Sequence, residues 1–345
     1  MKKKVALIFG VTGQDGAYLS KFLLKKGYQV HGVKRRSSQL NTLRVDDIYS
    51  DPLLKKNNFY LHFGDVTDSL SVFSIIKKIN PSEIYNLAAQ SHVAVSFDLP
   101  EYTTNTDALG TLRILDSILK INKKIKFYQA GSSEMFGKVF ETPQNEKTPF
   151  YPRSPYGVAK VYSHWITINY RESYKLFACN GILFNHESPL RGETFVTKKV
   201  VTALCKIKLK KQKKLFVGNL NAKRDWGHAE DYVQAMWKIL QHKQPDDFVI
   251  CTGKQHSIKQ FINMVSKDLE IKIIWRGKGI NEKGYDQNNN CIIECSKKYF
   301  RPAEVDTLVG DSSKARRILK WKPKHDIHSL IKDMISYELK IHKND

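Results

Sequence analysis

The sequence predicts an α/β fold in which helices cover both faces of a doubly wound parallel sheet, followed by a smaller C-terminal lobe. Three observations support this prediction. Apolar runs of strand length alternate with segments of helical periodicity through the N-terminal half of the chain. A glycine-punctuated turn separates the first apolar run from the first helical segment. Beyond Asn185 the alternation gives way to short, basic segments broken by glycine.

The regular part of the chain can be divided into strands and helices from its apolar periodicity. Strands are expected at residues 5–9, 29–33, 59–63, 83–89, 126–130 and 180–184. Helices are expected at residues 15–26, 69–79, 104–121 and 156–174. We therefore expect a Rossmann domain over residues 1–180. Residues 181–345 should form mainly a second, interleaved lobe, with segments that return to the first domain.

Composition restricts the class of protein. The formal net charge is +23, and the lysines are spread along the whole chain, which is typical of a solvated surface but also favours anionic ligands. The five cysteines are odd in number and lack paired spacing, so we expect neither a disulfide framework nor a metal site. No apolar run approaches the roughly 20 residues of a membrane helix. These features predict a cytoplasmic protein that binds no membrane.

The turn after the first strand has the features of a dinucleotide-binding site. Its glycines have the spacing G-x-x-G-x-x-G between a strand and a helix, and the expected cofactor contacts are Gly10, Thr12, Gly13, Gln14, Asp15 and Gly16. Glycines at this point let the backbone approach a pyrophosphate, and the free amides of the helix N-terminus favour an anion.

The end of the second strand indicates which dinucleotide is bound. An acidic residue there would hold a ribose hydroxyl of NAD, but this chain has Lys34, Arg35 and Arg36. Guanidinium groups can bind a 2′-phosphate in a bidentate manner. NADP is therefore favoured over NAD, and the alternative is a solvated basic loop.

The ends of the next two strands extend the expected cofactor site. Asp65 and Val66 follow the third strand, where the adenine edge would lie. The fourth strand ends in mostly small residues, which would let the cofactor pass over the strand ends. These residues are Leu87, Ala88, Ala89, Gln90 and Ser91.

Two clusters indicate acid–base chemistry. Tyr156 and Lys160 are four residues apart on an expected helix and so share one face. The Lys160 ammonium would stabilise a tyrosinate that accepts a proton from a sugar hydroxyl. Ser132 and Glu134 follow the fifth strand, where a hydroxyl and a carboxylate could bind a sugar hydroxyl and move a carbon-bound proton.

The motifs together resemble those of the GDP-mannose 4,6-dehydratases, a family within the extended short-chain dehydrogenase/reductase superfamily. The glycine turn, the Arg-rich second turn and the set Ser132, Tyr156 and Lys160 resemble the superfamily. Longer segments resemble the dehydratases, and the resemblance runs over nearly the whole chain. These segments are residues 11–16, 91–97, 150–156, 185–189, 191–197, 224–228 and 301–305.

The resemblance implies a reaction and catalytic roles. Tyr156 would deprotonate the sugar 4-hydroxyl as hydride passes from C4 to NADP, and Ser132 would hydrogen-bond the 4-oxygen. Glu134 would remove the C5 proton and protonate the departing C6 hydroxyl. Hydride would then return to C6. Lys160 would hold the nicotinamide ribose and adjust the pKa of Tyr156.

The resemblance also implies binding residues and a substrate. Further cofactor contacts would be Tyr102, His186 and Arg191. Contacts to the GDP-sugar would be Ser91, Asn185, Lys199, Arg224, Arg301 and Glu304, together with Ser132, Glu134 and Tyr156. The family usually has Thr in place of Ser132. The segment 279–295 is shorter and richer in Asn than in many members. We therefore expect residues 279–304 to choose between GDP-mannose and its alternative, GDP-manno-heptose.

Other classes of protein remain open at this point. An epimerase or a reductase on the same fold would not need Glu134 as a base for the C5 proton. A nucleic-acid-binding protein could use the basic run at residues 206–214, but basic runs are usually solvated helix ends, and no aromatic stacking pattern accompanies this one. We therefore expect no nucleic acid. The resemblance implies a homotetramer or homodimer in which the Arg35 loop meets a neighbour's cofactor.

Overall fold

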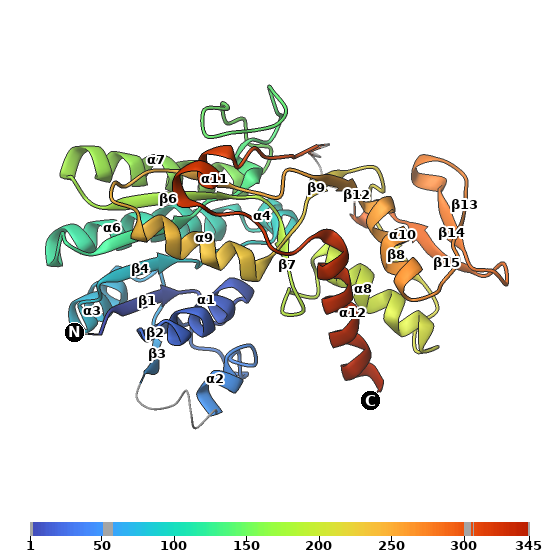
Figure 1. The fold of residues 1–345 in the computed structure, drawn as a ribbon, viewed down its shortest axis with the longest axis horizontal. Helices are drawn as coiled ribbons and strands as arrows, with labels where there is room; N and C mark the ends of the chain where they lie inside the picture. Colours follow the sequence, from blue (N-terminus) through green and yellow to red (C-terminus); the bar gives the residue numbers. More distant parts are fainter. Residues whose placement is uncertain (1–2, 51–57, 300–304, 306, 344–345) are drawn as a thin grey trace.

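The larger lobe of the computed structural model is built on a seven-stranded sheet in which all neighbouring strands are parallel (Figure 1). The structure describes residues 3–50, 58–299, 305 and 307–343. The strand order β11-β6-β5-β4-β1-β2-β3 confirms the predicted doubly wound α/β class. The strands are β1 (Val5–Phe9), β2 (Gln29–Lys34), β3 (Phe59–Phe63), β4 (Glu83–Asn86), β5 (Lys126–Ala130), β6 (Ala178–Leu183) and β11 (Phe248–Ile250).

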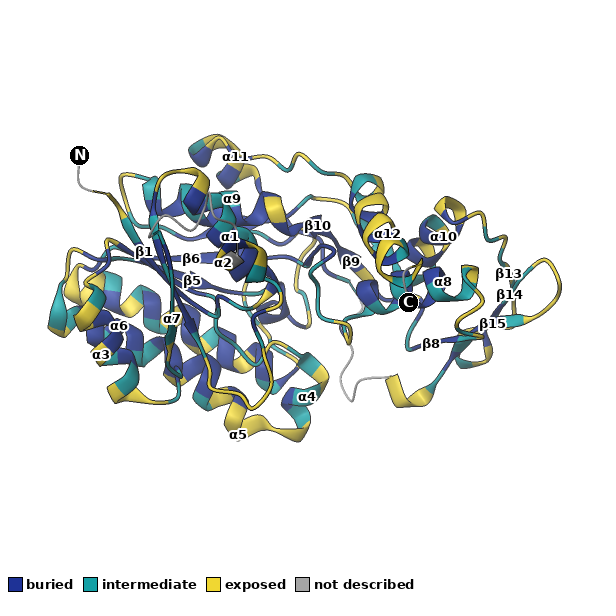
Figure 2. Cartoon of the chain, turned by 90° about the horizontal axis from the view of Figure 1, so that it is seen from below, coloured by how far each residue is buried: buried dark blue, intermediate teal, exposed yellow. Residues whose placement is uncertain are grey.

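Helices cover both faces of this sheet (Figure 2). Side chains alternate along a strand, so Leu7 and Phe9 pack under α3 and α6 while Ala6 and Ile8 pack under α1 and α9. The helices of this lobe are α1 (Gln14–Lys25), α2 (Asp46–Ser50), α3 (Ser69–Ile79), α4 (Val93–Asp98), α5 (Pro100–Thr103), η1 (Thr104–Leu109), α6 (Gly110–Ile121), α7 (Pro155–Tyr174), α9 (Ala229–Gln241) and α11 (Ser313–Leu319).

Local sequence explains where the main helices begin. The Asp68 carboxylate accepts the N–H groups of Leu70 and Ser71 and caps α3. The Ser154 hydroxyl accepts the N–H of Gly157 at 3.0 Å and caps α7, whose first residue is Pro155. Both helices agree with their predicted spans to within one residue.

Two predicted elements differ from the structure. The fourth strand was expected over residues 83–89, but β4 ends at Asn86, because the chain leaves the sheet where it meets the Gly10 backbone. The helix expected over residues 104–121 begins as the π-helical turn η1 and becomes α-helical only at Gly110. Within η1 the Asp107 carbonyl accepts hydrogen bonds from the Thr111 and Ser163 hydroxyls.

The smaller lobe lies at the carboxyl edge of the large sheet and has its own apolar core (Figure 1). Its sheet has the order β13-β14-β15-β8, in which only the β15–β8 pair is parallel. Its elements are α8 (Val196–Lys208), β8 (Leu215–Val217), α10 (Ile258–Asp268), β13 (Ile274–Arg276), η3 (Gly279–Asn281), β14 (Lys283–Tyr285), β15 (Cys291–Cys295), η4 (Lys297–Tyr299) and α12 (Ile327–Lys343).

Short two-stranded sheets join the lobes. They pair β7 (His186–Glu187) with β10 (Gly227–His228) and β9 (Lys223–Asp225) with β12 (Gln255–Ser257). After residue 181 the chain returns to the large lobe as α9 against α1, as β11 beside β6 and as α11 against β11. Of the helices in the described ranges, none combines the length and the apolar character needed to cross a membrane.

A pair of neutral histidines on β2 and β3 predicts a pH-dependent stability. His31 Nδ1 and His62 Nε2 are 2.8 Å apart and share one proton, so the two rings cannot easily be cationic together. Burial, and then the charge of His62, lower the pKa of His31 to about 4. The unfolded chain therefore binds more protons than the folded chain below pH 6.5, and stability is lost as the pH falls from about 6.5 towards 4.

Between about pH 6.5 and pH 4, we expect the free energy of unfolding to fall by about 1–2 kcal/mol more in the wild type than in His31→Gln, after allowance for solvent screening. Urea unfolding at several pH values measures the difference. His328→Gln, a change at an exposed histidine of α12, is the control and should follow the wild type. If the free energy of unfolding changes with pH in the same way in the wild type and in His31→Gln, the histidine pair does not titrate as described.

Candidate active site

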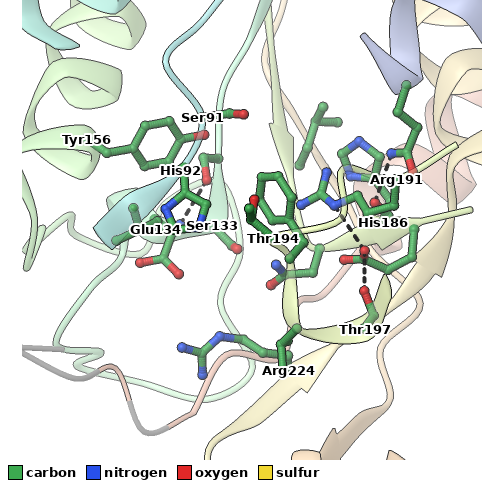
Figure 3. Close-up of a pocket in the computed structure, with 18 of the residues that line it drawn as sticks. Ser91, His92, Ser133, Glu134, Tyr156, His186, Arg191, Thr194, Thr197 and Arg224 are labelled. Atoms are coloured by element: carbon green, nitrogen blue, oxygen red, sulfur yellow. Dashed lines mark hydrogen bonds and ion pairs between the residues drawn. The ribbon is translucent and has the colours of Figure 1, made fainter. Parts of the chain in front are cut away.

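A cleft of about 820 Å³ opens at the carboxyl edge of the large sheet. The residues that follow β1, β4, β5 and β6 form one wall, and residues of the smaller lobe form the other. The carboxyl edge of an open parallel sheet is the usual place for a ligand. Figure 3 shows Tyr156 and Glu134 on one side of this cleft and His186 and Arg191 on the other, with Arg224 beyond them.

The glycine turn after β1 lies where backbones touch. A Cβ at Gly10, whose φ is +83°, would lie 2.8 Å from the carbonyl of Leu87 and the nitrogen of Ala88. A Cβ at Gly16 would lie 2.4 Å from the Gly10 carbonyl oxygen. Both distances are shorter than any side chain tolerates. Glycine is therefore required for α1 to start this close to the strand ends.

The start of α1 is suited to an anion. Gly13 is the N-cap residue, no side chain of the described chain caps the helix, and residues 13–16 line the cleft. The amides of the first turn are therefore available to a phosphate group. With the glycine contacts, this uncapped helix end fits the pyrophosphate of a dinucleotide.

An ion pair joins the start of α1 to the segment that follows β6. Asp15 Oδ2 lies 2.7 Å from His186 Nε2, and His186 Nδ1 lies 2.8 Å from the Phe184 carbonyl oxygen. Both neighbours accept hydrogen bonds, so both ring nitrogens donate and His186 is an imidazolium. Burial opposes both charges, but the attraction between them raises the pKa of His186 and lowers that of Asp15. Gln14 completes this contact by donating to Asp15 and to the His186 carbonyl.

The predicted catalytic residues come together on the sheet side of the cleft. Ser132, Glu134, Tyr156 and Lys160 all line it. Ser132 follows β5 and is the N-cap of the short helix η2 (Ser133–Met135), which contains Glu134. Tyr156 and Lys160 share one face of α7. Glu134, Tyr156 and Lys160 are each less than a tenth exposed. Lys160 Nζ donates to the Ala130 carbonyl at 3.0 Å and lies 5.7 Å from the centre of the Tyr156 ring.

The surroundings of Tyr156 keep its hydroxyl protonated in the isolated chain. Burial raises the pKa of Tyr156 well above its usual value, and the charges of Asp107 and Glu134 raise it further. A hydrogen bond with Ser132 and the charge of Arg191 act in the opposite direction. Any use of Tyr156 as a base therefore depends on positive charge placed beside it.

Basic side chains gather at the other end of the cleft. Lys199 and Arg224 line this end together with Asn185. Lys199 Nζ lies 3.2 Å from the centre of the Tyr299 ring. Arg224 is anchored by hydrogen bonds from Nη1 to the carbonyls of Lys223 and Val305, at 2.9 and 2.7 Å. The predicted residues Arg301 and Glu304 lie outside the described residues.

The other predicted cofactor residues are divided between the cleft and its surroundings. Leu87, Ala89, Ser91, His186 and Arg191 line it. Eight predicted residues are not among its lining residues: Thr12, Arg35, Arg36, Asp65, Val66, Ala88, Gln90 and Tyr102.

Several of these eight are engaged elsewhere. Arg35 is exposed and donates to the Tyr102 hydroxyl. Asp65 Oδ1 accepts hydrogen bonds from the Thr67 amide and hydroxyl, at 2.9 and 2.8 Å. The side chain of Val66 is packed in the apolar core against Gly110, so a contact of Val66 with the cofactor would involve its main chain and stays a prediction.

The structure adds cleft residues that the motifs did not identify. His92 and Phe195 lie on opposite walls with ring centres 5.6 Å apart, and Lys298 and Tyr299 close the basic end. His92 and Phe195 lie within recognised motif segments and could have been found there. None of residues 279–295 lines the cleft. This segment forms η3, β14 and β15 at the far side of the smaller lobe (Figure 1). Within the expected range 279–304, Lys298 and Tyr299 do line the cleft, and residues 300–304 lie outside the described residues. The expectation that residues 279–304 choose the sugar stays a prediction.

One group outside the cleft has the spacing of metal ligands. Ligand atoms of His228, Glu230 and His325 lie within 4.8 Å of one another. However, His228 Nδ1 accepts the Glu230 N–H at 3.1 Å as the N-cap of α9, so its proton is on Nε2, which faces Asp333 at 3.1 Å. The lone pair that a metal would need is used by the helix cap.

Known proteins were compared with the chain. The sequence matches the family described as GDP-mannose 4,6 dehydratase over residues 7–334. "GDP-mannose 4,6 dehydratase 2" of Caenorhabditis elegans is 54% identical over 348 residues, covering 100% of this chain and 91% of that protein. A GDP-mannose 4,6-dehydratase of Vibrio cholerae is 53% identical over 354 residues, covering 99% and 95%. The structure of dTDP-glucose 4,6-dehydratase from Bacillus anthracis in complex with NAD superposes with a TM-score of 0.81 at 19% identity, covering 99% and 98%, and shows likeness of fold.

The Asp15–His186 pair should contribute far more to stability than a surface pair of the same length. Breaking a buried pair leaves an uncompensated charge and typically costs about 3–5 kcal/mol, whereas an exposed i,i+4 pair is worth about 0.3–0.5 kcal/mol. A double-mutant cycle with Asp15→Asn and His186→Asn, followed by urea unfolding, measures the coupling. Lys120–Asp116, also 2.7 Å long but exposed, is the matched control. Equal coupling energies in the two cycles would show that burial does not strengthen the Asp15–His186 pair.

Proposed function

The chain belongs to the GDP-mannose 4,6-dehydratase family, and from this premise we propose how its cleft removes water from GDP-mannose. The product is GDP-4-keto-6-deoxymannose, and the chain is accordingly a lyase. The observation that carries the proposal is the meeting of two acid–base groups, Tyr156 and Glu134, beside an uncapped helix end in one cleft. An epimerase or simple reductase has no need of a second base for a carbon-bound proton.

The cofactor that we propose is NADP, held by the domain of residues 1–180. The glycine turn and the start of α1 fit its pyrophosphate, and Leu87, Ala89 and Ser91 line its path over the strand ends. Arg35 and Arg36, exposed after β2 where an acid would select NAD, are proposed to bind the 2′-phosphate, with Tyr102 beside them. Bound NADP supplies the hydride acceptor for C4 and the donor for C6, and its oxidised nicotinamide adds positive charge beside Tyr156.

Tyr156 is proposed as the base for the sugar 4-hydroxyl. Its hydroxyl already shares a hydrogen bond with Ser132, which would hold the 4-oxygen in the same place. Lys160 has one hydrogen bond to the Ala130 carbonyl, and its remaining protons are proposed to bind the nicotinamide ribose. Arg191 and the imidazolium of His186 add positive charge on the facing wall.

Glu134 is proposed to move the proton between C5 and the C6 oxygen. A 4-ketone acidifies the neighbouring C5 proton, so a carboxylate at this point can remove it and return it to the departing hydroxyl. Glu134 lines the same cleft as Ser132 and Tyr156, so a sugar whose 4-oxygen is held by those two residues would have its C5 and C6 near this carboxylate. Its burial keeps water from competing for the proton.

The GDP portion is proposed to bind the lobe of residues 181–345. Lys199, Arg224 and Asn185 line the basic end of the cleft and suit a diphosphate by charge. Arg301 and Glu304 remain proposed partners from the segment outside the described residues. A homotetramer or homodimer and a cytoplasmic setting are also proposed, the latter because all five cysteines are free thiols and four of them are buried.

Cofactor preference can be measured directly. We expect calorimetry to give tight binding of NADP and far weaker binding of NAD, because a guanidinium pair meets the 2′-phosphate. The double substitution Arg35→Ala with Arg36→Ala should weaken the binding of NADP by about 10-fold or more and leave the binding of NAD nearly unchanged. Arg317→Ala, at an exposed position of α11, is the matched control. Equal affinity of the wild type for the two cofactors would contradict the assignment.

The two proposed bases should fail at different steps. Incubation of the wild type with GDP-mannose should yield a product lighter by one water, without net consumption of cofactor. In a single turnover, Tyr156→Phe should form no reduced nicotinamide, whereas Glu134→Gln should accumulate it and stall before water loss. Each loss should be about 10²–10⁴-fold, as is usual for an acid–base group.

Absorbance of the reduced nicotinamide and mass spectrometry of the product are the measurements. Tyr162→Phe and Glu172→Gln, both on the outer side of α7, are matched controls and should behave as the wild type. Normal dehydration by Glu134→Gln would exclude that residue from the mechanism. A second incubation with GDP-manno-heptose tests the alternative sugar.

A further inference from the structure

A buried carboxylate that belongs to none of the motifs above influences both Tyr156 and Lys160 through its charge. Asp107 is part of the π-helical turn η1 and is 1% exposed. Its Oδ1 accepts the main-chain N–H of Gln90 at 2.7 Å. Its Oδ2 is also buried and has no hydrogen-bond partner among the described residues. A carboxylate buried with one oxygen unpaired is costly unless a nearby charge compensates it.

The turn that carries Asp107 is attached to the helix that carries Lys160. The Asp107 carbonyl accepts hydrogen bonds from the Ser163 hydroxyl at 2.6 Å and from the Thr111 hydroxyl at 2.9 Å. Ser163 lies one helical turn beyond Lys160 on α7, so the side chain of Asp107 is held at a fixed place relative to the ammonium. π-Helical turns are often found at functional sites.

Lys160 needs a counter-ion. Its ammonium is buried, and among the described residues it has a single hydrogen bond, to the Ala130 carbonyl at 3.0 Å. Burial lowers the pKa of Lys160, and two carboxylates oppose this, first Asp107 and then Asp15. Asp15 is already paired with His186 at 2.7 Å. Asp107 is therefore the carboxylate whose charge is left to balance Lys160.

We propose that Asp107 is the buried counter-ion of Lys160, a positioning residue that keeps the ammonium charged while Tyr156 acts as a base. This role rests on the proposed function of Tyr156 and Lys160. This role explains why one oxygen of the Asp107 carboxylate is buried without a hydrogen-bond partner among the described residues, because the positive charge of Lys160 compensates it.

The other charges around this cluster fix the direction of the effect. Tyr156 is influenced by Asp107 and Glu134, which raise its pKa, and by Arg191, which lowers it. Burial raises the pKa of Asp107 to about 6 in spite of Lys160, so Asp107 is an anion at neutral pH. Removal of this anion helps Tyr156 to ionise but leaves Lys160 without compensation. Loss of the Asp107 charge should lower the pKa of the fully buried Lys160 more than it lowers the pKa of Tyr156, on which several charges act. The earlier loss of the Lys160 proton should therefore be the larger effect on activity.

The pH dependence of kcat is the first test. Asp107→Asn should move the alkaline limb of the profile to lower pH by about one unit or more, because Lys160 loses its proton earlier. Ser163→Ala is the matched control, since it removes a hydrogen bond to the same residue but keeps the carboxylate. Its alkaline limb should stay in place. An active Asp107→Asn enzyme with an unshifted limb would overturn the proposal.

A second test needs neither cofactor nor substrate and so separates this proposal from the proposed function. Asp107→Asn is made in the wild type and in Lys160→Met, and each protein is unfolded in urea at pH 8. Asp107→Asn should lower the midpoint in the wild type, where it leaves a buried ammonium unpaired, and leave it unchanged or raise it in Lys160→Met, where the anion has no partner. Equal losses in the two backgrounds would overturn the pairing. This result decides the case if Asp107→Asn is inactive at every pH. Failure of the wild type to dehydrate GDP-mannose would instead refute the proposed function.

Discussion

The contact between the Gly10 main chain and the Leu87–Ala88 peptide is the constraint on which the cleft depends. β1 and β4 are adjacent, and their chains leave the sheet so close together that a single Cβ would lie 2.8 Å from the neighbouring backbone. The next glycine contact, Gly16 against the Gly10 carbonyl, fixes where α1 begins. The uncapped first turn of α1 is therefore placed over the strand ends, and the cleft has its anion-binding floor before any side chain contributes.

Buried charges in this chain are compensated in two different ways. Arg171 and Asp247 are paired by two hydrogen bonds of 2.9 and 2.7 Å, and Asp247 also accepts from the Asn180 amide, so nearly all its acceptor capacity is used. Such a pair holds structure and has nothing left for a ligand. The charged groups at and near the cleft are less completely satisfied within the described part of the chain, where Lys160 has one hydrogen bond and one carboxylate oxygen of Asp107 has none. Incomplete pairing lowers the stability of the fold. It also leaves hydrogen-bond donors and charges that can act on the reacting groups.

Local patterns predicted what local forces decide. The spans of β3 and α3 agree with the sequence to the residue, because an apolar run and an Asp68 cap act within a few positions of the chain. Ser132, Glu134, Tyr156 and Lys160 line one cleft, because each follows a strand or shares a helix face, and their catalytic roles stay a prediction.

Features that depend on distant contacts could not be predicted in this way. The early end of β4 is set by a backbone 76 residues away, and the π-helical turn forms where the Asp107 carbonyl bonds to Ser163 of another helix. No sequence motif identifies Asp107, because only the packing of η1 against α7 brings it near Lys160. The direction of the Val66 side chain likewise depends on a distant residue, because the glycine at position 110 leaves room for it in the core.

The part of the chain beyond residue 180 contributes to both lobes. β11, α9 and α11 come from the second half but complete the large sheet and its apolar core, in which Tyr232 and Met236 are fully buried. The Asp225 carboxylate accepts the amides of Thr252 and Gly253, at 3.0 and 2.8 Å, and so ties β9 to the end of β11. Its neighbour Arg224 faces the cleft. The residue that holds the smaller lobe to the sheet is thus adjacent to one proposed to hold the substrate, and the position of the lobe and the geometry of the site are set by the same short strand.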